Sequence, residues 1–87
     1  MTTWTETTVL ADVRAFVERE FLYMRPGLVL DDDASLLKSG VIDSMGVLDM
    51  MGHLEETFDV RPEDDEITEA NLGSLRSIAR FVVAKRG

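Results

Sequence analysis

The residues of this sequence best placed to do chemistry are an aspartate and a serine at the start of a predicted helix. Asp43 is a favourable N-cap residue, because its carboxylate can accept hydrogen bonds from free N–H groups of the first helical turn. Ser44 follows, so its hydroxyl lies at the rim of the helix. A phosphate attached to this hydroxyl would lie beside N–H donors at the positive end of the helix dipole. Serine near a helix start is often only a capping residue, and the pair alone favours that simpler interpretation.

The surrounding residues reverse this preference. Residues 36–45 read Leu-Leu-Lys-Ser-Gly-Val-Ile-Asp-Ser-Met, which resembles the attachment site of acyl and peptidyl carrier proteins. In that family a Leu and a Gly precede Asp-Ser, and a Leu or Met follows. The resemblance covers about residues 10–82, including the segment 55–58 with the acidic loop after it, and Leu75 with Ile78 near the end. It implies that Ser44 carries a covalent 4′-phosphopantetheine arm and that Asp43 belongs to the same site.

The resemblance also implies a function. In such proteins a transferase moves phosphopantetheine from coenzyme A onto the serine, and the thiol of the arm holds a substrate as a thioester while separate enzymes act on it. The chain is therefore expected to be a carrier and not an enzyme. Residues 43–46, Asp-Ser-Met-Gly, are similar to D-alanyl carrier proteins and to free-standing carriers of biosynthetic clusters. We expect a free-standing carrier of an acyl or aminoacyl group, in polyketide, nonribosomal peptide or related secondary metabolism.

Two other functions remain open. An acidic helical interaction module without a prosthetic group would explain the charge, but it would leave the pattern of residues 40–45 accidental. A fatty-acyl carrier of primary metabolism would share the attachment site. Those carriers, however, have an acidic residue where this chain has Gly46, and tend to have a large apolar side chain where it has Gly52. A hydrolytic or metal-dependent enzyme is not expected, because no nucleophile–base–orienter set and no clustered ligands are evident.

The helix after Asp43 is predicted to run from about Ser44 to Phe58. Apolar residues at helical spacing define its expected core face: Val47, Met51, Leu54 and Phe58. A second stripe lies away from that face and is expected to dock partners: Met45, Leu48, Asp49, Gly52 and Glu56. Leu48 fits this docking surface and the edge of the core equally well. The glycine at position 52 could allow a partner to approach the helix closely, or it could simply be tolerated there. His53 is expected to be solvated.

Composition limits the other possibilities. The chain has 87 residues, no cysteine and one histidine, so one small domain without disulfides or a metal site is expected. The net charge is −8, and the acidic residues between positions 43 and 66 oppose a single Arg61. This charge disfavours nucleic acid and anionic membranes. It favours partners with basic docking surfaces, namely the transferase, a loading enzyme and downstream synthases. No apolar run approaches the ~20 residues of a membrane span, so a cytoplasmic protein is expected. We also expect a monomer.

The remaining elements complete an all-α fold. Residues 1–7 are expected to be frayed, although Trp4 could fold back on the bundle. A first helix is predicted from apolar residues at three- and four-residue steps, ending at Arg25-Pro26-Gly27: Val9, Leu10, Val13, Phe16, Val17, Phe21 and Met24.

After this helix, the connection of residues 28–42 should pack on the core, and its Asp31-Asp32-Asp33 run should form a solvated capping turn rather than a calcium loop. A short helix or turn is expected at residues 67–71. Ser74 should then cap a last helix with an inward stripe of Leu75, Ile78, Ala79 and Val82. The predicted fold is one domain, residues 1–87: a small antiparallel bundle of three main helices plus one short helix.

Overall fold

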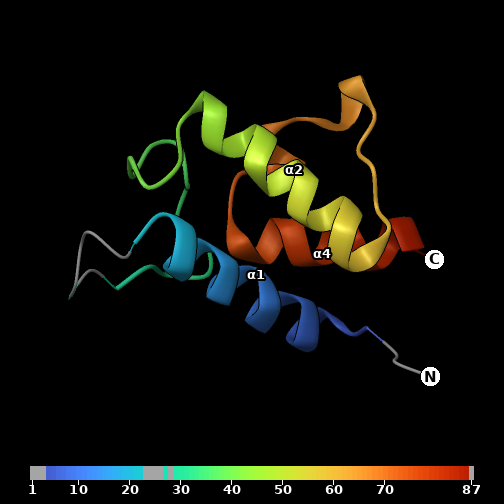
Figure 1. Cartoon of the computed structure of the whole chain (residues 1–87), viewed down its shortest axis with the longest axis horizontal. Helices are drawn as coiled ribbons and strands as arrows, with labels where there is room; N and C mark the ends of the chain where they lie inside the picture. Colours follow the sequence, from blue (N-terminus) through green and yellow to red (C-terminus); the bar gives the residue numbers. More distant parts are fainter. Residues whose placement is uncertain (1–3, 23–26, 28, 87) are drawn as a thin grey trace.

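The computed structural model describes residues 4–22, 27 and 29–86, and these residues form a helical bundle. Its main helices are α1 (Glu6–Glu20), α2 (Ser44–Phe58) and α4 (Leu75–Arg86), joined by the short α3 (Glu69–Leu72) and the 3-10 turn η1 (Asp64–Glu66). Helix α1 runs opposite to both α2 and α4 (Figure 1). The described residues contain no strand. The predicted fold of three main helices and one short helix is therefore confirmed.

Helix α1 begins earlier than the sequence suggested. Thr5 is its N-cap: the Thr5 hydroxyl accepts a hydrogen bond from the N–H of Thr8, whose own hydroxyl accepts one from the N–H of Thr5. Trp4 packs edge-on against Phe58, with ring centroids 4.6 Å apart. The prediction that residues 1–7 are frayed is thus wrong for residues 4–7, and residues 1–3 lie outside the described residues. The helix ends at Glu20, whereas the sequence predicted that it continues to Met24. Residues 21 and 22 are not helical, and Met24 is not among the described residues.

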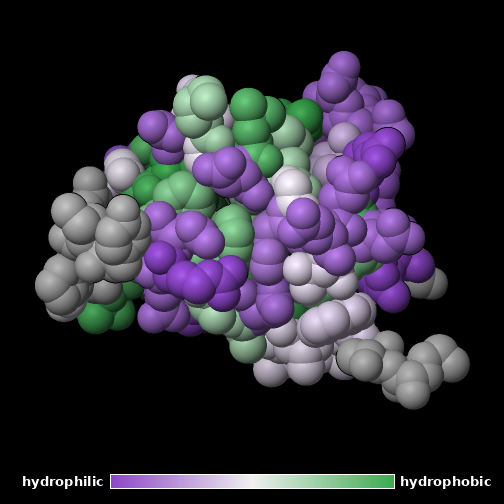
Figure 2. Space-filling view, in the orientation of Figure 1, coloured by the Kyte–Doolittle hydropathy of each residue, from purple (hydrophilic) through white to green (hydrophobic). Residues whose placement is uncertain are grey.

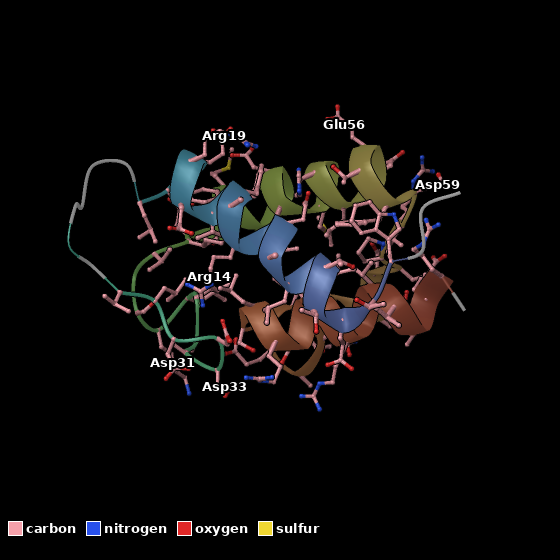
Figure 3. All side chains as sticks on the ribbon, turned by 90° about the horizontal axis from the view of Figure 1, so that it is seen from below. Arg14, Arg19, Asp31, Asp33, Glu56 and Asp59 are labelled. Carbon is pink, nitrogen blue, oxygen red and sulfur yellow. The ribbon has the colours of Figure 1, made fainter. Side chains whose placement is uncertain are left out.

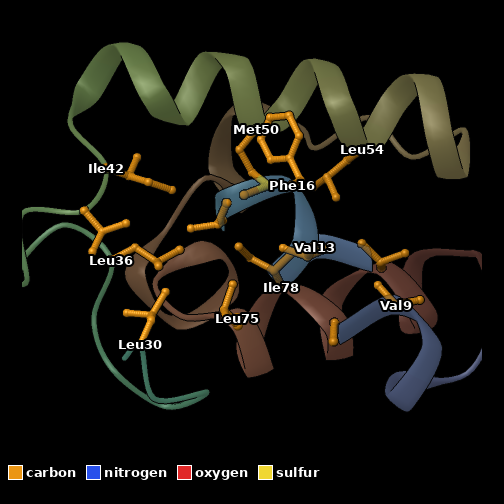
Figure 4. Packing of buried hydrophobic residues seen from close by; sticks show 14 of the residues in the cluster. Val9, Val13, Phe16, Leu30, Leu36, Ile42, Met50, Leu54, Leu75 and Ile78 are labelled. Atoms are coloured by element: carbon orange, nitrogen blue, oxygen red, sulfur yellow. The ribbon is translucent and has the colours of Figure 1, made fainter. Parts of the chain in front are cut away.

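The core lies between α1, α2 and α4, and the connection before α2 closes one end (Figure 4). Val13 from α1, Leu54 from α2 and Ile78 from α4 are fully buried. The predicted inward stripe of α4 is confirmed, because Leu75, Ile78, Ala79 and Val82 are at most 1% exposed.

The core face of α2 differs from the prediction. Met50 is buried, with 3% exposure, whereas Val47 and Met51 are only partly buried. The reason lies at Gly46, one turn before Met50, where the helix packs closely against Phe21 and Ile42. This close approach turns the stripe of Gly46, Met50, Leu54 and Phe58 toward the core.

The Asp31–Asp33 turn lies at the surface and also joins two helices. Asp32 forms ion pairs with Arg14 of α1 and Arg76 of α4, and Asp33 forms another with Arg76 at 2.7 Å. The labelled Arg14, Asp31 and Asp33 lie together at this end of the molecule (Figure 3). Asp31 and Asp33 are exposed, as expected of a solvated turn, but the ion pairs were not predicted, because sequence separations of 18 and 43 residues hide these partners.

The connection beyond this turn packs on the core as expected. Leu30, Leu36, Val41 and Ile42 are buried, although Leu37 is 48% exposed and Leu28 lies outside the described residues. The N–H of Leu36 donates to the carbonyl of Gly73 at 2.8 Å, so the segment leading to α2 is attached to the start of α4.

The last part of the chain follows the prediction closely. Ser74 caps α4, because its hydroxyl accepts a hydrogen bond from the N–H of Ser77 at 3.1 Å. The short helix expected at residues 67–71 appears as α3, with Thr68 as its N-cap. Across residues 4–22, 27 and 29–86, none of the helices combines the length and apolar character needed to cross a bilayer.

Candidate attachment site and docking face

Asp43 holds the start of α2 in place. Its backbone is extended, and its Oδ1 accepts a hydrogen bond from the N–H of Gly46 at 2.8 Å. Its carbonyl accepts a second one from the N–H of Val47 at 3.1 Å. Asp43 is therefore the N-cap that the sequence predicted.

Ser44 is the first residue of α2 and is exposed. The N–H groups at such a position have no acceptor within the helix, and the helix dipole makes this end positive. A phosphate ester on the Ser44 hydroxyl would therefore lie beside backbone donors and outside the packed core. The residues present fit a covalently attached phosphopantetheine group in this respect.

Two glycines shape the backbone and the packing around Ser44. Gly40 has φ +78°, a left-handed conformation that glycine adopts without strain. Gly46 is buried, and a Cβ there would lie 2.7 Å from Cγ2 of Ile42 and 3.0 Å from Cε1 of Phe21. The end of α1 thus packs directly below the first turn of α2. No local pattern could have indicated this role of Phe21, because the contact joins segments far apart in the chain.

The predicted docking residues all lie on the surface. Met45 is 68% exposed and Leu48 is 57% exposed, and Asp49, Gly52 and Glu56 are also exposed. Leu48 is therefore a surface residue and not part of the core edge. Figure 2 shows hydrophobic surface above the beginning of α2 and hydrophilic surface toward its end. The face is apolar next to Ser44 and acidic further along.

Four of these five residues line a groove between α1 and α2. The groove has a volume of about 470 Å³ and is lined by eight residues. Helix α2 contributes Leu48, Asp49, Gly52, His53 and Glu56, and helix α1 contributes Phe16, Arg19 and Glu20. Met45 is not among them and lies nearer to Ser44. The labelled Arg19 and Glu56 lie along the same edge of the molecule (Figure 3).

His53 is not the solvated residue that the sequence suggested. Its side chain is 13% exposed and is stacked on Phe16, with ring centroids 4.2 Å apart. Its Nε2 lies 2.7 Å from Oδ1 of Asp12, and its Nδ1 lies 3.4 Å from Oγ1 of Thr57. His53 therefore forms the floor of the groove and links α2 to α1. Asp12 is 41 residues away in sequence, so no local pattern could have indicated the pair.

The acidic residues of α2 differ in their pairing. Glu55 forms an ion pair with Arg61, and this hydrogen-bonded guanidinium lowers the pKa of Glu55 below its usual value. Asp49 and Glu56 form no ion pair with any residue that the structure describes. Their charges are available to a partner. No cluster of three or more metal-binding side chains was found among residues 4–22, 27 and 29–86.

A comparison with known protein families shows to which family the chain belongs. Residues 12–82 match the family described as "Phosphopantetheine attachment site". The match covers most of the chain, which therefore belongs to this family. Its domains hold 4′-phosphopantetheine covalently and act as non-catalytic carriers, so the predictions of the family and the cofactor are confirmed.

The fold is also that of a carrier protein. The chain is similar to one in the crystal structure of a Bradyrhizobium japonicum glycine:[carrier protein] ligase complexed with glycylated carrier protein. The TM-score is 0.63 at 22% sequence identity, and the match covers 87% of this chain and 96% of the other. At this identity the likeness concerns the fold alone. None of the curated proteins compared with the chain matches it.

Proposed function

We propose that Ser44 carries the phosphopantetheine arm and that the chain holds a small acyl or aminoacyl group on it as a thioester. The observation that carries this proposal is the position of Ser44, exposed at the first residue of α2 and directly after the cap formed by Asp43. The arm supplies the thiol that this cysteine-free chain lacks. The chain itself presents the Ser44 oxygen, fixes it through Asp43 and offers N–H donors beside it.

The small size of the cargo follows from the packing near the site. The apolar hollow under the first turns of α2 has a volume of only about 10 Å³, roughly the space of one water molecule. It is lined by Leu36, Leu37, Ile42, Val47, Met50, Leu72 and Ile78. A long fatty chain would have to push these residues apart, whereas a small polar group remains outside. This argument favours the small cargo over the fatty-acyl carrier of primary metabolism.

The similar crystal structure supports the same choice. Its carrier protein is described as glycylated, so a protein of this fold holds an amino acid. Together with the Asp-Ser-Met-Gly run of residues 43–46, this favours an amino acid or short acyl group in polyketide, nonribosomal peptide or related secondary metabolism.

The partners proposed for this function have basic docking surfaces. They are a phosphopantetheinyl transferase, a loading enzyme and the downstream synthases. The docking face consists of Met45, Leu48, Asp49, Gly52 and Glu56, whose apolar start and acidic end suit a partner with the opposite charge. With a net charge of −8, the chain would be repelled by anionic membranes, and we place its action in the cytoplasm, as a monomer.

A labelling experiment tests the carrier function. The protein is incubated with a phosphopantetheinyl transferase and acetyl-coenzyme A labelled in the acetyl group. The protein should gain the label, and neutral hydroxylamine should release it, because a thioester is cleaved under these conditions. Absence of label, or label that resists hydroxylamine, would contradict the proposal. The same incubation with the labelled compound but without the transferase is the control for non-covalent carry-over.

A further inference from the structure

The groove between α1 and α2 has an aromatic floor that is fixed by contacts within the protein. Phe16 and His53 are stacked with their planes at 17°, and Asp12, also on α1, lies 2.7 Å from Nε2 of His53. One wall is almost bare, since a Cβ at Gly52 would meet no atom within 4 Å. A side chain from another molecule could therefore approach the backbone of α2 closely at Gly52.

The rim of the groove is acidic and mostly unpaired. Asp49 and Glu56 form no ion pair within the described part of the chain, and Glu20 contributes a third carboxylate from α1. Arg19 is the opposing cation, but it meets Glu20 only at 3.5 Å, and both side chains are at least half exposed. Such an exposed ion pair contributes little to stability and is easily broken. The groove thus has a net negative charge, because three carboxylates and one guanidinium line it.

These features select the chemistry of the occupant. It needs a positive end for the carboxylates and a flat or apolar part for Leu48, Phe16 and His53. An arginine side chain has both, because its guanidinium binds carboxylates in a bidentate manner and stacks on aromatic rings. A second copy of this chain is a poor occupant, since its net charge is also −8.

The distance from Ser44 indicates which partner supplies this arginine. With a rise of 1.5 Å per residue, Leu48 lies about 6 Å and Glu56 about 18 Å along α2 from Ser44. An enzyme that acts on the thiol of the arm reaches it through a long flexible linker. The transferase must instead bring its active site to the Ser44 hydroxyl itself, and so it must hold the protein surface close to this residue.

We propose, on the basis of the function proposed above, that the phosphopantetheinyl transferase docks by inserting an arginine side chain into the groove between α1 and α2. Glu20, Asp49 and Glu56 bind its guanidinium, and the Phe16–His53 pair supports its stem. Helix α1 is therefore part of the docking surface, together with the face of α2.

Two variants test this docking mode from opposite walls. Gly52→Phe places a ring in the groove from α2, and its Cβ would meet no atom within 4 Å, so the fold should be kept. Glu20→Lys reverses the charge from α1. The matched controls are Ala11→Phe and Glu18→Lys, two exposed positions of α1 that do not line the groove. Thermal unfolding of every variant shows that the fold is retained.

The measured quantity is kcat/KM for transfer of phosphopantetheine from coenzyme A to each unmodified protein. For Gly52→Phe and Glu20→Lys, kcat/KM should fall by about tenfold or more, and the effect of Glu20→Lys should shrink at high salt. The two controls should keep the wild-type value. Arg19→Gln removes the competing cation and should raise kcat/KM at low salt.

The outcomes separate this inference from the proposed function. If the wild type is modified on Ser44 but Gly52→Phe and Glu20→Lys keep its kcat/KM, the transferase does not use the groove, while the carrier function stands. If the two controls lose as much as the groove variants, the groove is likewise not the docking site. If the wild type is not modified at all, the proposed function fails and this inference fails with it.

Discussion

The imidazole of His53 on α2 is stacked on the ring of Phe16 on α1, with centroids 4.2 Å apart and an angle of 17° between the planes. Oδ1 of Asp12, one turn before Phe16, accepts a hydrogen bond from Nε2–H of His53 at 2.7 Å. The two contacts join α1 to α2 in the middle of both helices. They hold the acidic face of α2 at a fixed angle to the end of α1.

Replacing His53 should therefore loosen this junction. His53→Ala removes the stacking on Phe16 and the hydrogen bonds to Asp12 and Thr57, so the free energy of unfolding should fall by about 1–3 kcal/mol. Urea denaturation of the wild type, His53→Ala, Asp12→Ala and the double variant measures the coupling between the two residues. An interaction energy of about 0.5 kcal/mol or more is expected. Fully additive single effects would show that the pair contributes nothing.

Two glycines of the same helix should respond to alanine in opposite ways. Gly52→Ala should stabilise the protein by about 1 kcal/mol, because alanine favours helix and its Cβ meets no neighbour. Gly46→Ala gains the same propensity but forces a Cβ to within 2.7 Å of Ile42 Cγ2. Such overpacking costs about 1–3 kcal/mol, so this variant should be less stable than Gly52→Ala by that amount. Equal urea midpoints for the two variants would contradict the close packing at Gly46.

The ion pair between Glu66 and Lys85 should be visible in an acid titration. The hydrogen bond from Lys85, helped by the N–H of Glu63, lowers the pKa of Glu66 below 4.5. Because this pKa is lower in the folded protein, the stabilisation is present above the unfolded pKa and is lost as the pH falls through the folded one. Lys85→Met should raise the pKa of Glu66 toward 4.5, as followed by carboxyl NMR. Lys38→Met is the control, and an unchanged Glu66 pKa in Lys85→Met would rule out the pair.

The cargo can be tested by its length. Acyl groups of increasing length are loaded on the protein, and the amide and methyl NMR shifts of the core are followed. Because the hollow below α2 is only about 10 Å³, the shifts of Met50, Leu54 and Phe58 should stay small and independent of length. Large shifts that grow with length would mean that the core opens around the chain. In that case a fatty-acyl carrier would be the better description.

The sequence predicts best what is decided locally. The bounds of α2 follow from the capping carboxylate of Asp43 and from apolar residues at helical spacing, and both signals lie within one short segment. The inward stripe of α4 is equally local, with Ser74 as its cap. The exposure of the docking face could be predicted for the same reason, since it is the side of α2 opposite its apolar stripe.

What the sequence missed depends on contacts between distant segments. His53 is buried because Phe16 and Asp12 lie on another helix, and Met50 replaces Met51 in the core because Gly46 lets α2 turn toward Phe21. The groove is a property of two helices together, so the part contributed by α1 had no signal of its own. The order of residues 4–7 depends on the contact of Trp4 with Phe58, 54 positions further along the chain.

The central claim, that Ser44 holds the arm, is tested most directly by mass spectrometry of the protein after incubation with a phosphopantetheinyl transferase and coenzyme A. The wild type should gain the mass of one phosphopantetheinyl group, and fragmentation should place it on Ser44. Ser39→Ala removes the other serine hydroxyl of residues 36–45 and should be modified like the wild type. Ser44→Ala should keep its helix content, because Asp43 still caps α2, and should gain no mass. A phosphopantetheinyl group on Ser44→Ala, or on any other residue of the wild type, would contradict the account.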